Sequence, residues 1–152
     1  DCLVGSEMCI RDSCGTGVEP AALDLDTEIH RLELKVAAGA EFIMTQPVYD
    51  PKVLETFLKR IEHIKLPVML GLCPLAGLRN ALFLNEHVPG MSVPSGVLAR
   101  MKLAEEKGSG QSEGVAIARE MLASVAGSVQ GAYVMPPFSR HKMAIQVLDG
   151  YL

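Results

Sequence analysis

The sequence predicts an α/β fold in which short parallel strands alternate with helices. Three apolar runs, at residues 42–45, 68–72 and 131–135, have the length and the Gly or Pro boundaries of buried strands. Segments with apolar residues at helical spacing separate them. Strand, helix and strand in succession favour parallel pairing through right-handed crossovers. Three strands are too few for an open sheet with two covered edges, so the pattern indicates part of a larger sheet.

The first two helices carry clear start signals. Asp24 is a candidate N-cap of a helix that ends at Gly39, and Asp50 with Pro51 opens the next helix. That second helix has a charged face and an apolar face, which consists of Val53, Leu54, Phe57, Leu58 and Ile61.

The remaining helices follow the run at residues 68–72. We expect them at about residues 77–86, 95–107, 112–125 and 140–148, with a Gly-Ser-Gly turn before the third. The helix expected to begin at Ser112 is the longest.

The composition argues against several classes of function. The net charge is −4 and no run of Lys or Arg is present, which disfavours a nucleic-acid partner. No apolar run reaches membrane-spanning length, so no membrane partner is expected. Cys14 and Cys73 belong to no CxxC or Cys/His cluster, so no metal site is predicted. The cytoplasm is the expected compartment.

Residues 1–13 lack apolar periodicity of either kind. They resemble one reading frame of a transposon-end sequencing adapter, and we predict that they are not native. The alternative is a native disordered or strand-like N-terminus. On the adapter interpretation, residues 14–152 are the C-terminal part of a longer protein that is truncated at its N-terminus.

Polar side chains follow the first predicted strand. Thr45 and Gln46 stand at its carboxyl end, where parallel α/β folds bind ligands. The Gln46 amide can donate and accept hydrogen bonds without titrating, which suits recognition of a heterocycle's amide-like edge. The alternative is a strand-end Gln bonded to loop backbone.

Four stretches resemble the methylenetetrahydrofolate reductase family. They are GAEFIMTQPVYD at 39–50, PVMLGLCPL at 67–75, NEHVPGM at 85–91 and YVMPPFSR at 133–140. Their order and spacing extend the resemblance from about residue 17 to residue 152. It implies a partial TIM (β/α)8 barrel that consists of the last three strands with their helices. The first and last stretches resemble the branch that is fused to a homocysteine S-methyltransferase domain.

The resemblance also implies an activity. NAD(P)H would reduce FAD, and the reduced flavin would convert 5,10-methylenetetrahydrofolate to 5-methyltetrahydrofolate. Folate is then the substrate, with a fused methyltransferase domain as a possible upstream partner. The alternatives are a pterin-dependent methyltransferase or lyase barrel without flavin, and an inactive fragment. The choice between NADH and NADPH and the oligomeric state stay open.

Family positions map onto individual residues here. Gln46 matches a catalytic amide that contacts the pterin, while Asn80 and Arg140 match folate-binding residues. Leu84 occupies the position of an aromatic residue that packs on the substrate ring, and core packing is its alternative role. The alternative to a folate-binding role for Asn80 is that it is an exposed residue of a helix.

Glu28, Arg31 and Lys35 share one helix face, at spacings of three and four residues. The resemblance assigns this face to the FAD diphosphate and adenosine, with Lys35 the best match. The alternative is a solvated charged face. The family's general acid and its flavin-tuning Asp lie on strands that this chain does not contain.

Overall fold

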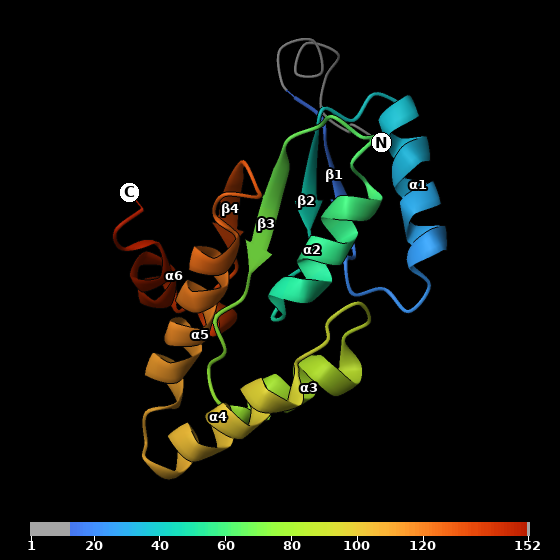
Figure 1. The fold of residues 1–152 in the computed structure, drawn as a ribbon. Helices are drawn as coiled ribbons and strands as arrows, with labels where there is room; N and C mark the ends of the chain where they lie inside the picture. Colours follow the sequence, from blue (N-terminus) through green and yellow to red (C-terminus); the bar gives the residue numbers. More distant parts are fainter. Residues whose placement is uncertain (1–12, 152) are drawn as a thin grey trace.

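The computed structural model describes residues 13–151 and contains one parallel sheet with helices packed on one of its faces (Figure 1). The strands run in spatial order β1-β2-β3-β4, which is also their order in the chain. Their bounds are Gly15–Val18 for β1, Phe42–Thr45 for β2, Val68–Leu72 for β3 and Gly131–Val134 for β4. All three pairings are parallel, as predicted.

Six α-helices and one 3-10 helix connect and follow the strands within the described residues. They are α1 Leu25–Ala37, α2 Pro51–Arg60, α3 Leu78–His87, α4 Ser95–Glu106, α5 Gly110–Val125, η1 Pro137–Ser139 and α6 His141–Leu148. None of the helices in residues 13–151 is long and apolar enough to cross a bilayer.

The α/β fold is as predicted, but the count of three strands was wrong. β1 is a fourth strand, with the sequence GTGV, and its two glycines disfavour a strand on propensity alone. Backbone pairing with β2 holds it in place. Glu41 N–H donates to the Cys14 carbonyl at 2.7 Å, and Gln46 N–H donates to the Val18 carbonyl at 2.8 Å.

The predicted starts of the first two helices are confirmed. The Asp24 side chain accepts from Thr27 N–H at 3.0 Å, and the Asp50 side chain accepts from Lys52 N–H at 2.9 Å. α4 begins at Ser95, as expected, with Pro94 at its N-cap. One later boundary was wrong, because α5 begins at Gly110 instead of residue 112. The prediction for residues 1–13 falls mostly on residues 1–12, which lie outside the described residues.

The core lies between the sheet and helices α1, α2, α5 and α6. Ile43 of β2 and Leu70 of β3 belong to the same buried cluster as Leu32 of α1 and Phe57 of α2. The buried face of α5 adds Val115, Ala118, Met121, Leu122 and Val125. Burial of this apolar face explains why α5 is helical despite Gly114 within it.

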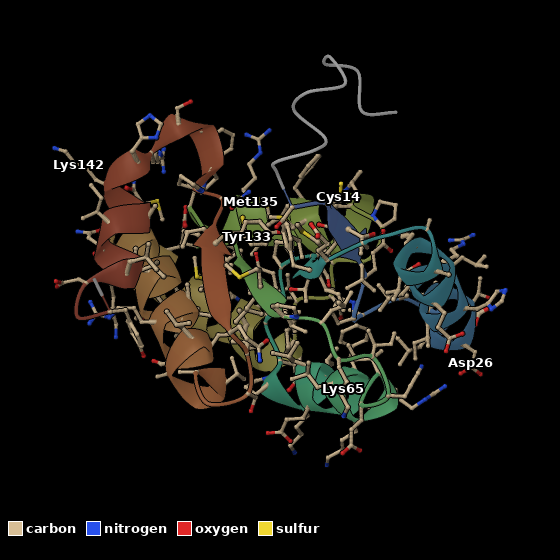
Figure 2. The ribbon with its side chains drawn as sticks, turned by 90° about the horizontal axis from the view of Figure 1, so that it is seen from above. Cys14, Asp26, Lys65, Tyr133, Met135 and Lys142 are labelled. Atoms are coloured by element: carbon tan, nitrogen blue, oxygen red, sulfur yellow. The ribbon has the colours of Figure 1, made fainter. Side chains whose placement is uncertain are left out.

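The other face of the sheet, here called the inner face, carries no helix in the view from above (Figure 2). The strand register places its residues side by side: Gly15, Gly17, Phe42, Met44, Met69, Gly71, Gly131 and Tyr133. None of these residues is charged. In a closed (β/α)8 barrel, the corresponding positions fill the barrel interior.

Thr45 joins three strands at the carboxyl end of the sheet. Its hydroxyl accepts from Gly71 N–H at 2.9 Å, and its carbonyl accepts from the Tyr133 hydroxyl at 2.6 Å. A Cβ at Gly71 would clash with the Thr45 carbonyl oxygen and lie 3.0 Å from the Tyr133 hydroxyl oxygen. The close approach of β2, β3 and β4 therefore requires glycine at residue 71.

Replacement Gly71→Ala should lower the free energy of unfolding by roughly 2–3 kcal/mol, because the added methyl group meets backbone that cannot move aside. Gly127→Ala is the matched control, since a Cβ there meets no atom within 4 Å. Its effect should stay within about 0.5 kcal/mol. Urea unfolding followed by circular dichroism measures both. Equal stability of the two variants would contradict the proposed packing.

Candidate functional site

The structure divides the seven predicted site residues between two clefts. The first, here called the β1 cleft, has a volume of about 490 Å³ and is lined by Gln46, Glu28, Arg31 and Lys35. The second, here called the α3 cleft, has a volume of about 840 Å³ and is lined by Asn80, Leu84 and Arg140.

The charged side chains of the β1 cleft hold the outer edge of β1. Lys35 Nζ donates to the Gly17 carbonyl at 2.8 Å, and Glu28 Oε1 accepts from Glu19 N–H at 3.1 Å. Arg31 lies 3.8 Å from the Glu28 carboxylate. The Glu28 side chain is nearly buried, whereas the Arg31 side chain is 66% exposed. The predicted helix face is therefore turned towards β1 and is only partly solvated.

Lys35 and Arg31 keep unused N–H donors in the β1 cleft, which the Glu19 and Glu28 carboxylates also line. A lysine ammonium has three N–H donors, and the bond to Gly17 uses one of them. A Cβ at Gly17 would meet nothing within 4 Å, so the strand beside Lys35 borders open space. Lys35 and Arg31 together fit a diphosphate, which is the anionic part of FAD.

Gln46 is the first residue after β2, and its backbone bond to Val18 fixes the start of the loop. Its side chain lines the β1 cleft together with Met44 and Tyr133 of the inner face. The structure does not place Gln46 in the same cleft as Asn80 and Arg140. Cys73, which follows β3, does line the α3 cleft. Because β2 and β3 are paired neighbours, Gln46 at the end of β2 and Cys73 at the end of β3 lie at adjacent strand ends.

Asn80 stabilises the turn that leads into α3. Its Oδ1 accepts from Ala76 N–H at 3.0 Å, which leaves its NH2 group to reach the cleft. Leu84 packs on a small buried cluster with Leu75 and Ala81, as its alternative role predicted, and also lines the cleft. Its neighbour Phe83 is 54% exposed and stacks on the His87 ring at 5.1 Å.

Sequence reasoning missed Phe138 as a site residue. Phe138 and Ser139 have backbone φ values of 55° and 57°, which residues other than glycine rarely adopt. The Phe138 ring is 73% exposed at the cleft, and the Arg140 guanidinium lies 5.6 Å from its centroid. Strain of this kind concentrates at ligand sites. The sequence signal that could have identified Phe138 is its position directly after Pro136 and Pro137, in a loop that follows a predicted strand.

The α3 cleft therefore combines apolar walls with cationic groups. Its apolar lining includes Phe83, Leu84, Met135, Pro136, Pro137 and Phe138. Arg79 and Arg140 supply positive charge at the same cleft, and the Glu105 carboxylate, which accepts from Leu78 N–H, supplies one negative charge. A flat aromatic ligand with a carboxylate-bearing tail matches this combination.

Burial disfavours the ionised forms of the Cys73 thiol and the Tyr49 hydroxyl, which lie near the α3 cleft. Burial raises the pKa of the Cys73 thiol, and a smaller opposing effect comes from its contact with Tyr49. Burial also raises the pKa of the Tyr49 hydroxyl, which donates to the Cys73 carbonyl at 2.9 Å. Across residues 13–151, no three His, Cys, Asp or Glu side chains are grouped as metal ligands.

Comparison with solved structures shows the same fold in an uncharacterised protein from Clostridium thermocellum that binds two copies of 5-methyl-5,6,7,8-tetrahydrofolic acid. The TM-score is 0.65 at 15% sequence identity, and the match covers 89% of this chain and 51% of the other. The chain thus spans about half the length of that protein. No curated protein sequence matches the chain.

One protein-family model matches the chain over residues 4–145. That model is described as methylenetetrahydrofolate reductase. Because this range includes nearly all of the chain and both clefts, the protein belongs to the methylenetetrahydrofolate reductase family.

Proposed function

We propose that this chain contributes the folate-binding part of a flavin-dependent reductase that converts 5,10-methylenetetrahydrofolate to 5-methyltetrahydrofolate with NAD(P)H. The observation that carries the proposal is the α3 cleft, where exposed aromatic rings and two arginines meet at the carboxyl end of the sheet. Family membership supports the reaction class.

In this proposal the folate lies in the α3 cleft. Phe138 and Phe83 offer exposed ring faces to the aromatic portions of the substrate. Arg140 binds carboxylates of the glutamate tail, for which a planar guanidinium is suited. The amides of Asn80 and Gln46 donate to and accept from the pterin edge. Gln46, which lines the β1 cleft, would reach this edge from the end of the neighbouring strand β2.

FAD supplies the hydride chemistry of such a reductase, and the residues of the β1 cleft fit its diphosphate. Lys35 and Arg31 would hold that group, while Glu28 keeps Arg31 in place through their contact.

A second candidate is folate binding without flavin chemistry. Lys35 and Glu28 already hold the edge of β1, which gives both residues a structural role that needs no cofactor. Titration with FAD, followed by the change in flavin absorbance and fluorescence, separates the two candidates. No FAD binding by a protein that does bind folate would favour the second.

Folate binding should protect Cys73 from alkylation, because this thiol lines the α3 cleft. Its raised pKa predicts slow alkylation near neutral pH that accelerates as the pH increases, since only the thiolate reacts. An excess of 5-methyltetrahydrofolate should slow modification of Cys73 but not of exposed Cys14. Peptide-resolved mass spectrometry distinguishes the two sites.

The Arg140→Ala variant sharpens this experiment. Loss of a charged hydrogen bond of about 1.5–3 kcal/mol should raise the folate concentration needed for protection by roughly tenfold to a hundredfold. Lys59→Ala on α2 is the control, because Lys59 is exposed and lines neither cleft. Protection of Cys14 and Cys73 alike, or equal behaviour of the two variants, would place folate elsewhere.

Within a complete reductase, Gln46→Ala should slow reduction of the folate more than reduction of the flavin by NAD(P)H. The substitution removes an amide that makes two hydrogen bonds to the pterin, and this loss weakens folate binding by roughly 1–3 kcal/mol. Stopped-flow absorbance resolves the two half-reactions. A selective loss in flavin reduction would instead assign Gln46 to the β1 cleft alone, where its side chain lies with Lys35.

A further inference from the structure

The segment between β2 and α2 is buried directly after Gln46. Pro47 is fully buried, and Val48 and Tyr49 are 4% and 7% exposed. Val48 belongs to the main core between the sheet and its helices, whereas Tyr49 belongs to the smaller buried cluster that contains Leu75. The segment after β2 therefore joins two buried clusters.

Tyr49 uses its ring and its hydroxyl in different contacts. The ring packs with buried side chains from segments that follow β3, namely Leu75, Ala81, Val93, Met101 and Ile117. A phenylalanine ring would fill the same apolar space, so this packing does not require the hydroxyl. The hydroxyl instead donates to the Cys73 carbonyl at 2.9 Å. Because Cys73 lines the α3 cleft, this bond connects Tyr49 to a wall of that cleft.

Two hydrogen bonds therefore hold the chain on either side of Gln46. Before it, the Thr45 hydroxyl accepts from Gly71 N–H at 2.9 Å. After it, the Tyr49 hydroxyl donates to the Cys73 carbonyl. Gly71 belongs to β3 and Cys73 is the first residue after that strand. The backbone that carries the Gln46 side chain is thus fixed to the end of β3 at two points.

The loop that begins at Cys73 also sets the position of Asn80. Ala76 N–H donates to Asn80 Oδ1 at 3.0 Å, so the Asn80 side chain is oriented by this loop. On the opposite side, a Cβ at Gly114 of α5 would overlap the Leu75 carbonyl oxygen, so the loop and the helix are in close contact. A loop confined in this way holds Asn80 in a defined place relative to the Cys73 carbonyl.

We propose that Tyr49 is a positioning residue for the pterin ring of the folate. Its hydroxyl fixes the end of β2 relative to the loop after β3, and this sets the spacing between the Gln46 and Asn80 amides. Two amides that bind one ring must match its spacing, because hydrogen bonds weaken steeply with distance and angle. The inference rests on the proposed function, in which both amides bind the pterin edge.

The residues proposed for the rest of the folate come from a different segment. Phe138 and Arg140 lie between β4 and α6 and line the α3 cleft. β4 is tied to β2 through the Tyr133 hydroxyl and the Thr45 carbonyl, a bond that does not involve Tyr49. Loss of the Tyr49 hydroxyl should therefore weaken binding of the pterin and not of the glutamate tail. General weakening of the fold would affect both.

Calorimetric titration of the chain with three probes tests the proposal. They are 5-methyltetrahydrofolate, 6-methyltetrahydropterin, which lacks the tail, and p-aminobenzoylglutamate, which lacks the pterin. Tyr49→Phe keeps the ring and removes the hydroxyl, and it should lower the affinity for the two pterin-containing probes roughly threefold to tenfold. The affinity for p-aminobenzoylglutamate should be unchanged.

Two further variants serve as controls. Ser124→Ala on α5 also removes a hydroxyl that donates to a backbone carbonyl, that of Met121 at 2.7 Å. Ser124 lines neither cleft, so all three affinities should stay the same. Arg140→Ala should give the reverse pattern of Tyr49→Phe, with weaker binding of p-aminobenzoylglutamate and unchanged binding of 6-methyltetrahydropterin.

A double variant tests whether the Tyr49 hydroxyl acts through the Gln46 amide. Once Gln46→Ala has removed one of the two amides, their spacing no longer matters. In that background, Tyr49→Phe should change the affinity for 5-methyltetrahydrofolate by less than about twofold, since residues that act together have non-additive effects.

Three results would overturn the proposal in a chain that binds 5-methyltetrahydrofolate. They are an unchanged affinity in Tyr49→Phe, an equal loss of affinity for all three probes, and full additivity in the double variant. An original chain that binds none of the probes would instead overturn the proposed function, and this inference with it.

Discussion

The positions of both clefts depend on the hydrogen bonds made by Thr45. One residue uses its hydroxyl and its carbonyl to tie β2 to β3 and β4 at the end of the sheet where ligands bind. Thr45 is fully buried, so each bond is made away from water and would be costly to lose. Gln46 directly follows Thr45 in the chain. Cys73, the first residue after β3, lies two residues beyond Gly71. The site is therefore anchored to the most constrained part of the sheet.

The segments after β3 and β4 build the α3 cleft from opposite sides. α3 follows β3 and contributes Asn80 and Leu84, whereas the loop after β4 contributes Phe138 and Arg140. The strained backbone at Phe138 and Ser139 keeps an aromatic ring out of the core and at the cleft instead. A rigid sheet with strained loops at its carboxyl end is the arrangement that α/β enzymes use to position ligands.

Lys35 and Glu28 have a structural role at the edge of β1 as well as a place in the β1 cleft. In the isolated chain both residues satisfy edge groups of β1, and this role alone accounts for their contacts. The same two residues line the β1 cleft, so the contacts that hold the edge of β1 also fix where the charges of α1 lie in that cleft.

The sequence by itself determined the parallel α/β class, because strand length and helical periodicity are local properties. The Asp24 and Asp50 caps were predictable for the same reason. β1 was not predictable from propensity, since GTGV becomes a strand only through its bonds to β2. The family resemblance named seven site residues, but only the tertiary structure sorted them into two clefts. Which cleft contains Gln46 and which contains Asn80 depends on strand register and loop path, and these are set by contacts between residues far apart in the chain.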